Sequence, residues 1–373
     1  MTKITTNQYI LIAVFCILTS KLMTMPTVIF NYAGKDAVFS VMLNIAIELI
    51  LVLLITGLIK KYNNTTFFEL LKLKFKKIIA IIIASILALF LLFKGVFLIQ
   101  ETISFFTLSL FQSINMWLLI IPSILTILYI SYKGLSAIGR SIDIYWVFVF
   151  LALIIVFVIS ITKVDFTANL PYFENGFLPF LTGSMHSLFY VGNSLILLLF
   201  MGKVEIKPSL FKYTSLFSCG MAFFATFNIF IFYNLFENFV PYCTFALSNL
   251  SQYNPFVTEL GHIGWLSIVE STINLIFMSS IFCYCVRQYL QFSFCINKKI
   301  IAAIISGGLY FVVMYLFSFD LYKMLAFIKD YAYIYSLVLI PIIIILCIVL
   351  HSTYKKPSLT TNIYIKGKQN AKV

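Results

Sequence analysis

Four charged residues stand inside long apolar stretches of the sequence, where charges are rare: Lys21, Glu48, Lys94 and Glu101. A charge at the centre of a membrane-spanning helix costs roughly 3 kcal/mol, so such a group faces the bundle interior and finds a partner there. Lys94 and Glu101 are seven residues apart, hence two turns apart on one helix face. We therefore expect Glu48, Lys94 and Glu101 to form a buried charge network with Lys21. A role in binding a coupling ion or a ligand is the alternative.

The first apolar stretch, residues 7–30, is long enough to cross a bilayer but is interrupted by Thr19, Ser20 and Lys21, with Pro26 shortly after. A transmembrane helix has no water to satisfy its backbone, so a polar interruption survives only against protein or beside a wet cavity. Either Lys21 extends to the membrane interface, or the helix is broken at a binding site.

The sixth apolar stretch, residues 178–201, is interrupted as well. Gly192, Asn193 and Ser194 fall at its middle and His186 lies six residues earlier. Small polar residues and glycine are tolerated where a helix is unwound or closely packed, and they free backbone groups there. We interpret His186 as a satisfied interior histidine rather than a ligand-binding residue.

The composition predicts an all-α membrane protein with many spans. Of the 373 residues, 62% are apolar and 10% are charged, which leaves too little polar surface for a soluble fold. We expect one integral membrane domain over residues 1–353 and a basic cytoplasmic tail over 354–373. Ten spans are expected, at about 8–31, 37–59, 78–108, 114–132, 142–162, 178–201, 210–236, 259–286, 300–319 and 331–352.

The basic residues are distributed unevenly between the gaps that separate these spans. Of the 26 Lys and Arg residues, twenty lie at the N-terminus, in every second gap and in the C-terminal tail. Four lie in the other gaps, and Lys21 and Lys94 lie inside spans. The positive-inside rule places both termini in the cytoplasm. The same distribution argues against nucleic-acid binding, because the cations form no patch with stacking aromatics.

The first cytoplasmic gap carries the pattern of a short amphipathic helix over about 66–77. Thr66 and Glu69 have the spacing of a capping box, and apolar residues follow at helical intervals. We expect this helix to lie on the membrane surface, with its lysines against anionic headgroups, or simply to tie two spans together.

The two interrupted spans are the first of each half of a ten-helix chain. Interrupted segments at corresponding positions of two halves indicate a midplane binding site in an inverted-repeat transporter. We expect both breaks to line one cavity, where freed amides receive a ligand carboxylate. The predicted ligand-binding residues are Thr19, Ser20, Lys21, Leu22, Tyr190, Val191, Gly192 and Asn193.

Enzymatic chemistry has no support in the sequence. We find no metal-ligand cluster, no nucleophile–base spacing and no glycine-rich phosphate loop, so neither catalysis nor a cofactor is expected. The seven cysteines lie mostly inside apolar spans and are interpreted as small core-filling residues.

Short motifs across most of the chain resemble the B subunits of bacterial spore germination receptors, the endospore germination permease family of the amino acid/polyamine/organocation transporter superfamily. The motifs include the amphipathic segment before the third span and Arg140 opening the fifth. The others are Gln8, the LMTMP ending at Pro26, Glu101 with Pro122, Leu170-Pro171, Gly176, Pro179 and the FYVG of residues 189–192.

The resemblance implies a leucine-transporter-type fold, a 5+5 inverted repeat with helices 1 and 6 unwound around a small nutrient, typically an amino acid. It also implies a complex in the inner spore membrane with a membrane A subunit and a lipoprotein C subunit. Ser20 and Lys21 stand where relatives often have glycines. We therefore expect a germinant-sensing receptor subunit. The alternative is a secondary amino acid permease, with Glu101 or Glu48 as proton carrier.

The charge asymmetry generates a topology prediction. A reporter fused after Val373 should report the cytoplasm, and one inserted within residues 248–254 should report the opposite side. Accessibility of each reporter to an impermeant reagent measures this. Both reporters on one side would contradict the ten-span interpretation.

Overall fold

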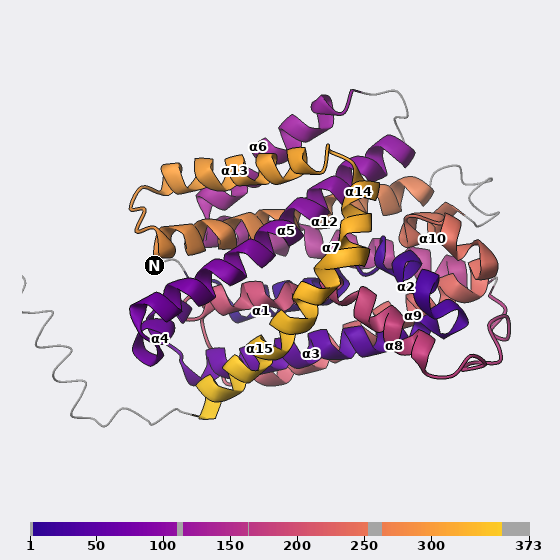
Figure 1. Cartoon of the computed structure of the whole chain (residues 1–373), viewed down its shortest axis with the longest axis horizontal. Helices are drawn as coiled ribbons and strands as arrows, with labels where there is room; N and C mark the ends of the chain where they lie inside the picture. Colours follow the sequence, from indigo (N-terminus) through magenta and orange to yellow (C-terminus); the bar gives the residue numbers. More distant parts are fainter. Residues whose placement is uncertain (1–2, 110–114, 163, 253–262, 353–373) are drawn as a thin grey trace, which may run out of the picture.

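The computed structural model describes residues 3–109, 115–162, 164–252 and 263–352. Throughout these residues the regular elements are helices, which confirms the predicted all-α class (Figure 1). An isolated parallel bridge pairs Ile4 with Val204. There, the Ile4 N–H donates to the Lys203 carbonyl, and the Ile4 carbonyl accepts from the Glu205 N–H, at 2.9 Å each.

Seven helical stretches in the described residues are long and apolar enough to cross a membrane, so the chain is a multi-pass membrane protein. A bent pair, Leu178–His186 with Leu188–Phe200, makes an eighth, and Thr6–Leu18 and Trp117–Lys133 are shorter apolar helices. The seven are Met25–Lys61, Lys77–Leu108, Leu135–Ile161, Leu210–Tyr242, Ser267–Ser293, Lys299–Leu316 and Leu321–His351.

The first apolar stretch is broken, as its polar interruption predicted. Helix α1 (Thr6–Leu18) ends before a turn in which Ser20 has a left-handed φ of 61°. Helix α2 (Met25–Ala33) then begins with Pro26 in its first turn, where the missing N–H costs nothing. The chain turns at Gly34, whose φ is 54°, through η1 (Gly34–Asp36) into α3 (Ala37–Lys61).

The amphipathic helix is present as α4 (Phe67–Lys74), and Thr66 and Glu69 form the capping box. Its apolar face packs on protein rather than lying open to the membrane. Phe67, Leu70 and Leu71 are buried, and Phe68 stacks on Phe292 near the end of α12. The lysines of α4, Lys72 and Lys74, remain exposed, and the Lys72 ammonium lies 5.2 Å from the centroid of the Phe292 ring.

Two long helices, α5 (Lys77–Ser109) and α12 (Ile263–Ser293), pack along much of their length in the middle of the molecule, and they run antiparallel (Figure 1). The Ser279 hydroxyl donates to the Gly95 carbonyl at 2.9 Å, which fixes their register. A Cβ at Gly95 would lie 1.9 Å from the Tyr310 hydroxyl oxygen, so α13 approaches this point as well. Small residues allow such close helix contacts in membrane bundles.

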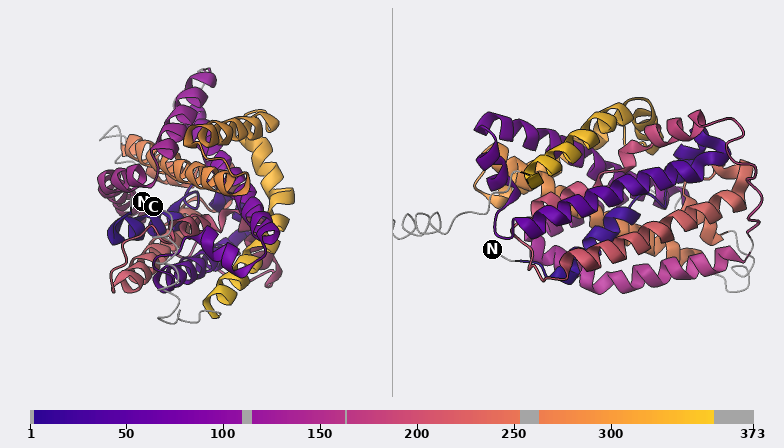
Figure 2. Two further views of the ribbon diagram at one scale, coloured as in Figure 1. Left: turned by 90° about the vertical axis from the view of Figure 1, so that its left-hand side faces the viewer. Right: turned by 90° about the horizontal axis from the view of Figure 1, so that it is seen from below.

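The remaining spans surround this pair. Helices α3, α9 (Leu210–Phe236) and α7 (Leu135–Ile161) lie along the longest axis, with α1 packed against α9 (Figure 2). Helices α6 (Trp117–Lys133) and α13 (Lys299–Leu316) pack on α12. The last span comprises α14 (Leu321–Phe327), the π-helical turn η5 (Ile328–Ala332) and α15 (Tyr333–Ser352), and crosses the outside of the bundle.

Two spans begin earlier than their apolar runs suggested. Helix α7 starts at Leu135, directly after Gly134 with a φ of 85°, so Arg140 and Asp143 lie within the helix rather than flanking it. The last span starts at Leu321 instead of near 331, because Asp320 caps α14 by accepting from the Tyr322 N–H. In both cases capping geometry, not hydrophobicity, sets the start.

The sixth span is split into α8 (Leu178–His186), η2 (Leu188–Tyr190) and η3 (Asn193–Phe200), bent by 47°. Helix α8 packs closely on α2, the second half of the other broken span. At Gly183 an added Cβ would lie 2.7 Å from the Ala33 Cβ and 3.0 Å from the Ser40 hydroxyl oxygen. The absence of a side chain at Gly183 therefore sets the distance between the two broken spans.

This close approach generates a stability prediction. Gly183→Ala should destabilise the protein by about 1–3 kcal/mol, because neither Ala33 nor the backbone beside it can move aside easily. Thermal melting in detergent measures the loss. Adding Ala33→Gly should recover most of it. Gly308→Ala, at an exposed helix glycine with open space around it, is the matched control and should leave melting unchanged. Equal melting of all variants would refute the contact.

Candidate functional site

At the first break, the chain leaves α1 and exposes backbone groups toward the middle of the bundle. Thr19 still bonds back to Phe15, and Lys21 N–H donates to the Leu18 carbonyl at 3.1 Å. The Leu22 and Met23 carbonyls accept from the N–H groups of Leu247 and Ala246, both at 3.0 Å. Those donors belong to α10 (Ala246–Gln252), a short helix in the long connection before α12. The first break is thus covered by a segment far away in sequence.

At the second break, Gly192 has a φ of 89°, a left-handed conformation that favours glycine. The neighbouring Tyr190 and Val191 are buried. The Asn193 side-chain amide donates to the carbonyls of Cys16 and Thr19, both at 3.2 Å. The second break is therefore tied directly to the end of α1, and the structure brings together the two groups of residues that the sequence predicted.

The carboxylate of Glu48, on α3, joins both breaks. Its Oε1 accepts from the Ser194 N–H at 2.7 Å, and its Oε2 accepts from the Gly192 N–H at 2.7 Å. The Lys21 ammonium lies 3.3 Å from Oε2, and both side chains are fully buried. Lys21 also donates to the Cys16 carbonyl at 3.1 Å. Amides freed at the sixth span, which we expected to receive a ligand carboxylate, are occupied by a carboxylate of the protein itself.

Lys94 extends this cluster without a direct ion pair. Its ammonium donates to the Asn193 Oδ1 at 2.8 Å and lies 5.2 Å from the ring centroids of Phe90 and Phe189. The side-chain amide of Asn193 thus connects the Lys94 ammonium on α5 with the carbonyls of the first break through hydrogen bonds. Contacts with two aromatic faces further stabilise a buried cation.

Glu101 stands apart from this cluster. Its Oε1 accepts from the Thr24 hydroxyl at 2.6 Å and from the Thr24 N–H at 3.2 Å. The same hydroxyl lies 3.0 Å from the hydroxyl of Tyr190. Within the described residues Glu101 forms no ion pair, and its Oε2 has no hydrogen-bond partner. The expected single network is therefore two: Lys21, Glu48 and Lys94 with the breaks, and Glu101 with Thr24.

Three polar side chains at this level of the bundle, Thr24, Gln100 and Asn274, were not among the site residues predicted from the sequence. Thr24 carries no charge and so gave no signal. Both amide atoms of Gln100 and the Oδ1 of Asn274 are buried without a partner among the described residues. From the Ser279–Gly95 contact, Gln100 lies five residues forward on α5 and Asn274 five residues back on α12, about 7.5 Å along each axis in the same direction. Buried polar atoms are normally paired, so these unpaired atoms at one level of the bundle require an explanation.

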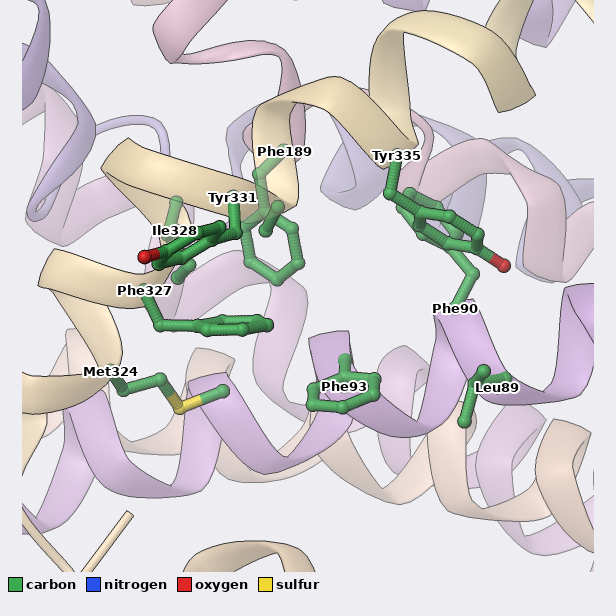
Figure 3. A pocket seen from close by; sticks show the side chains of 10 residues that line it. Leu89, Phe90, Phe93, Phe189, Met324, Phe327, Ile328, Tyr331 and Tyr335 are labelled. Carbon is green, nitrogen blue, oxygen red and sulfur yellow. The ribbon is translucent and has the colours of Figure 1, made fainter. Parts of the chain in front are cut away.

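An apolar cavity of about 240 Å³ adjoins the second break (Figure 3). Ring side chains from α5, η2 and the η5–α15 segment face one another across it. Phe90 and Phe189, the two rings over which Lys94 lies, are part of its wall. An opening here would expose the cation, so these rings insulate the buried charges.

His186 has a structural role, as the sequence suggested. Its ring stacks on Tyr32 at 4.1 Å, and its Nδ1 lies 2.8 Å from the Lys329 carbonyl oxygen. It also contacts Tyr333, at the start of α15. His186 thereby connects α2, α8 and the last span, away from the charge cluster.

A comparison with known protein families shows to which family the chain belongs. A family model described as spore germination protein matches residues 3–252. The chain belongs to the spore germination protein family. No curated protein matches its sequence significantly. The matched residues include both breaks, Glu48, Lys94 and Glu101, whereas Asn274 on α12 lies beyond the matched region.

A solved structure similar to this spore germination protein is that of the Eremococcus coleocola manganese transporter in complex with an aromatic bis-isothiourea substituted compound. The TM-score is 0.56 at 11% identity, and the match covers 89% of this chain and 75% of the transporter. At that identity the likeness concerns the fold alone. The chain therefore shares the helix arrangement of a solved membrane transporter. Within the described residues there is no His/Cys/Asp/Glu cluster suited to a metal ion.

The two separate carboxyl environments predict opposite outcomes for one conservative change. Glu48→Gln should destabilise the protein by about 3–5 kcal/mol, because Lys21 would remain buried without its anion. Glu101→Gln should cost far less, since an amide oxygen still accepts from Thr24 and no cation is left unpaired. Protein level and melting in detergent compare the two. Equal losses would mean that Glu101 belongs to the ion-pair cluster after all.

Proposed function

We propose that this spore germination protein is the nutrient-sensing subunit of a germinant receptor and binds a small nutrient, in particular an amino acid, beside its two broken spans. The observation that carries the proposal is that both breaks meet in the bundle interior, next to buried polar atoms that no described residue satisfies. Buried polar atoms are normally paired, so unpaired ones beside the breaks support a bound polar ligand.

The proposed architecture is a leucine-transporter-type 5+5 repeat of ten spans. One half comprises α1–α2, α3, α5, α6 and α7. The other half comprises α8–η3, α9, α12, α13 and α14–α15. In both halves the first span is the broken one, which supports the assignment. The domain would occupy residues 1–353 with both termini in the cytoplasm, consistent with the basic residues of alternate gaps.

The proposed ligand site combines the two breaks with the polar atoms on α5 and α12. It includes the predicted residues Thr19, Ser20, Lys21, Leu22, Tyr190, Val191, Gly192 and Asn193. Because Glu48 occupies the amides of the second break, we place the polar part of the ligand at Gln100, Glu101 and Thr24. The Glu101 carboxyl group would accept hydrogen bonds from the ligand ammonium, and the Gln100 amide would donate to its carboxylate.

The charge cluster supports signalling rather than simple storage of a ligand. Glu48 and Asn193 tie the first break to the second, so a ligand that moves one break biases the other. A ligand that binds one conformation more tightly increases the population of that conformation, and a partner subunit can respond to the change. In our proposal the receivers are a membrane A subunit and a lipoprotein C subunit in the inner spore membrane.

A secondary permease is the second candidate function. It is favoured by one specific feature: Glu101 forms no ion pair with a described residue, as a carboxyl that binds and releases a proton requires. Uptake of a labelled amino acid into proteoliposomes, with and without a proton gradient, separates transport from sensing. Binding without uptake supports the receptor.

Replacing Gln100 tests the ligand site without disturbing the fold. Gln100→Leu removes two buried atoms that have no partner, so the protein should remain as stable or become more stable. If these atoms hold the ligand, the germination response should shift at least tenfold to higher nutrient concentration at normal subunit levels.

The matched control is Ser218→Ala on α9, where another buried hydroxyl has no partner among the described residues. It should leave the dose–response curve unchanged. An unshifted curve for Gln100→Leu at full protein level would remove this position from the ligand site. Loss of the Gln100→Leu protein itself would contradict the premise that the amide has no structural partner.

A further inference from the structure

A second site lies on the outer face of the bundle, away from the breaks. A groove of about 850 Å³ runs between α1, α7 and α9. Each helix contributes side chains at helical spacing: Asn7, Ile10, Leu11 and Val14 from α1, Asp143, Trp146 and Phe150 from α7, and Leu216, Phe217, Gly220 and Met221 from α9.

The groove opens sideways, toward the hydrocarbon of the membrane. Leu216 and Phe217 on its rim are 61% and 56% exposed. A Cβ added at Gly220 would meet no atom within 4 Å, so the groove is open where this glycine lies. A hollow of this kind in a lipid-facing surface is filled by something apolar, because polar groups are too costly at this depth.

One end of the groove carries positive charge. Arg140 lies three residues before Asp143 on α7, and Lys212 lies four residues before Leu216 on α9, so each lies about one turn beyond the lining residues, toward the N-terminal end of its helix. Both side chains are exposed, and neither forms an ion pair with a described residue. Asp143, the acidic residue that lines this end of the groove, accepts a hydrogen bond from the Gln8 side-chain amide.

We propose that this groove binds a phospholipid with an anionic headgroup. Its acyl chain lies along Ile10, Val14 and Phe150, and its phosphate is held between Arg140 and Lys212. Charge complementarity favours the lipid over a partner helix, because an apolar helix would cover the end of the groove without neutralising either cation. Cations at the cytoplasmic membrane surface attract anionic lipids. The same end of the groove is the one that the charge distribution assigns to the cytoplasm.

The proposal is independent of nutrient sensing, but it touches the same helix. The groove-facing side of α1 is formed by Ile10, Leu11 and Val14, while the end of α1 at Leu18 opens into the first break. A lipid bound here therefore supports α1 from the side opposite the bundle core.

Tryptophan quenching tests the site directly, because Trp146 lines the groove. The full-length protein, with Trp117→Phe and Trp265→Phe, is reconstituted in nanodiscs of phosphatidylcholine. Brominated phosphatidylglycerol or brominated phosphatidylcholine is then added at equal, low mole fraction. We expect the anionic lipid to quench Trp146 at least threefold more effectively. Arg140→Gln with Lys212→Gln should abolish this preference.

Filling the groove is the second arm. Gly220→Leu should remove the quenching preference without loss of protein, because the added side chain enters open space. Gly308→Leu, at an exposed helix glycine outside the groove, is the matched control and should keep the preference. Equal quenching by both lipids, or a preference that survives the Arg140/Lys212 changes, would overturn the proposal. Protection of Trp146 from both lipids would assign the groove to another helix instead.

Discussion

The buried carboxylate of Glu48 is the interaction on which the centre of this protein depends. Two amides of the second break and one ammonium from the first donate to its two oxygens. An isolated ion at this depth would be prohibitively costly, and a break with unpaired amides would be too. Here the Glu48 carboxylate accepts hydrogen bonds from the free amides of the break, and those amides stabilise its charge. The unwound segments are thus stable because the charge is there, and the charge is tolerated because the segments are unwound.

This arrangement differs from a site that waits for an external ion. The cation and the anion at the junction of the breaks both belong to the chain, from α3 and from the turn after α1. Lys94 adds a second cation through the Asn193 amide. What the chain does not supply is a partner for Gln100, Glu101 Oε2 and Asn274 Oδ1 among the described residues. In our proposal these unsatisfied groups mark the ligand site, while the satisfied groups around Glu48 belong to the scaffold.

Much of this could be predicted from the sequence, because both breaks have local causes. Ser20 with Lys21, and Gly192 with Asn193, disrupt apolar runs at positions where only a break or a cavity makes sense. The partner of Lys21 could not be predicted, since Glu48 and Glu101 are equally acidic and their choice depends on how distant helices pack. The packing side of α4 was missed for a similar reason: amphipathicity defines a face but not what covers it. Thr24 was missed because a single hydroxyl near a proline resembles ordinary capping.

The covering of the first break has a kinetic consequence. The amides of Ala246 and Leu247 are bonded to the Met23 and Leu22 carbonyls, while at the opposite end Ile4 is paired with the strand-like segment around Val204. If the proposed ligand site lies beside the breaks, a solute can reach it where one of these backbone contacts opens. Local opening of α10, or of the residues around Ile4, would then contribute to the rate of access. Substitutions in α10 would then alter how quickly the proposed ligand is captured while leaving the side chains of the proposed pocket unchanged.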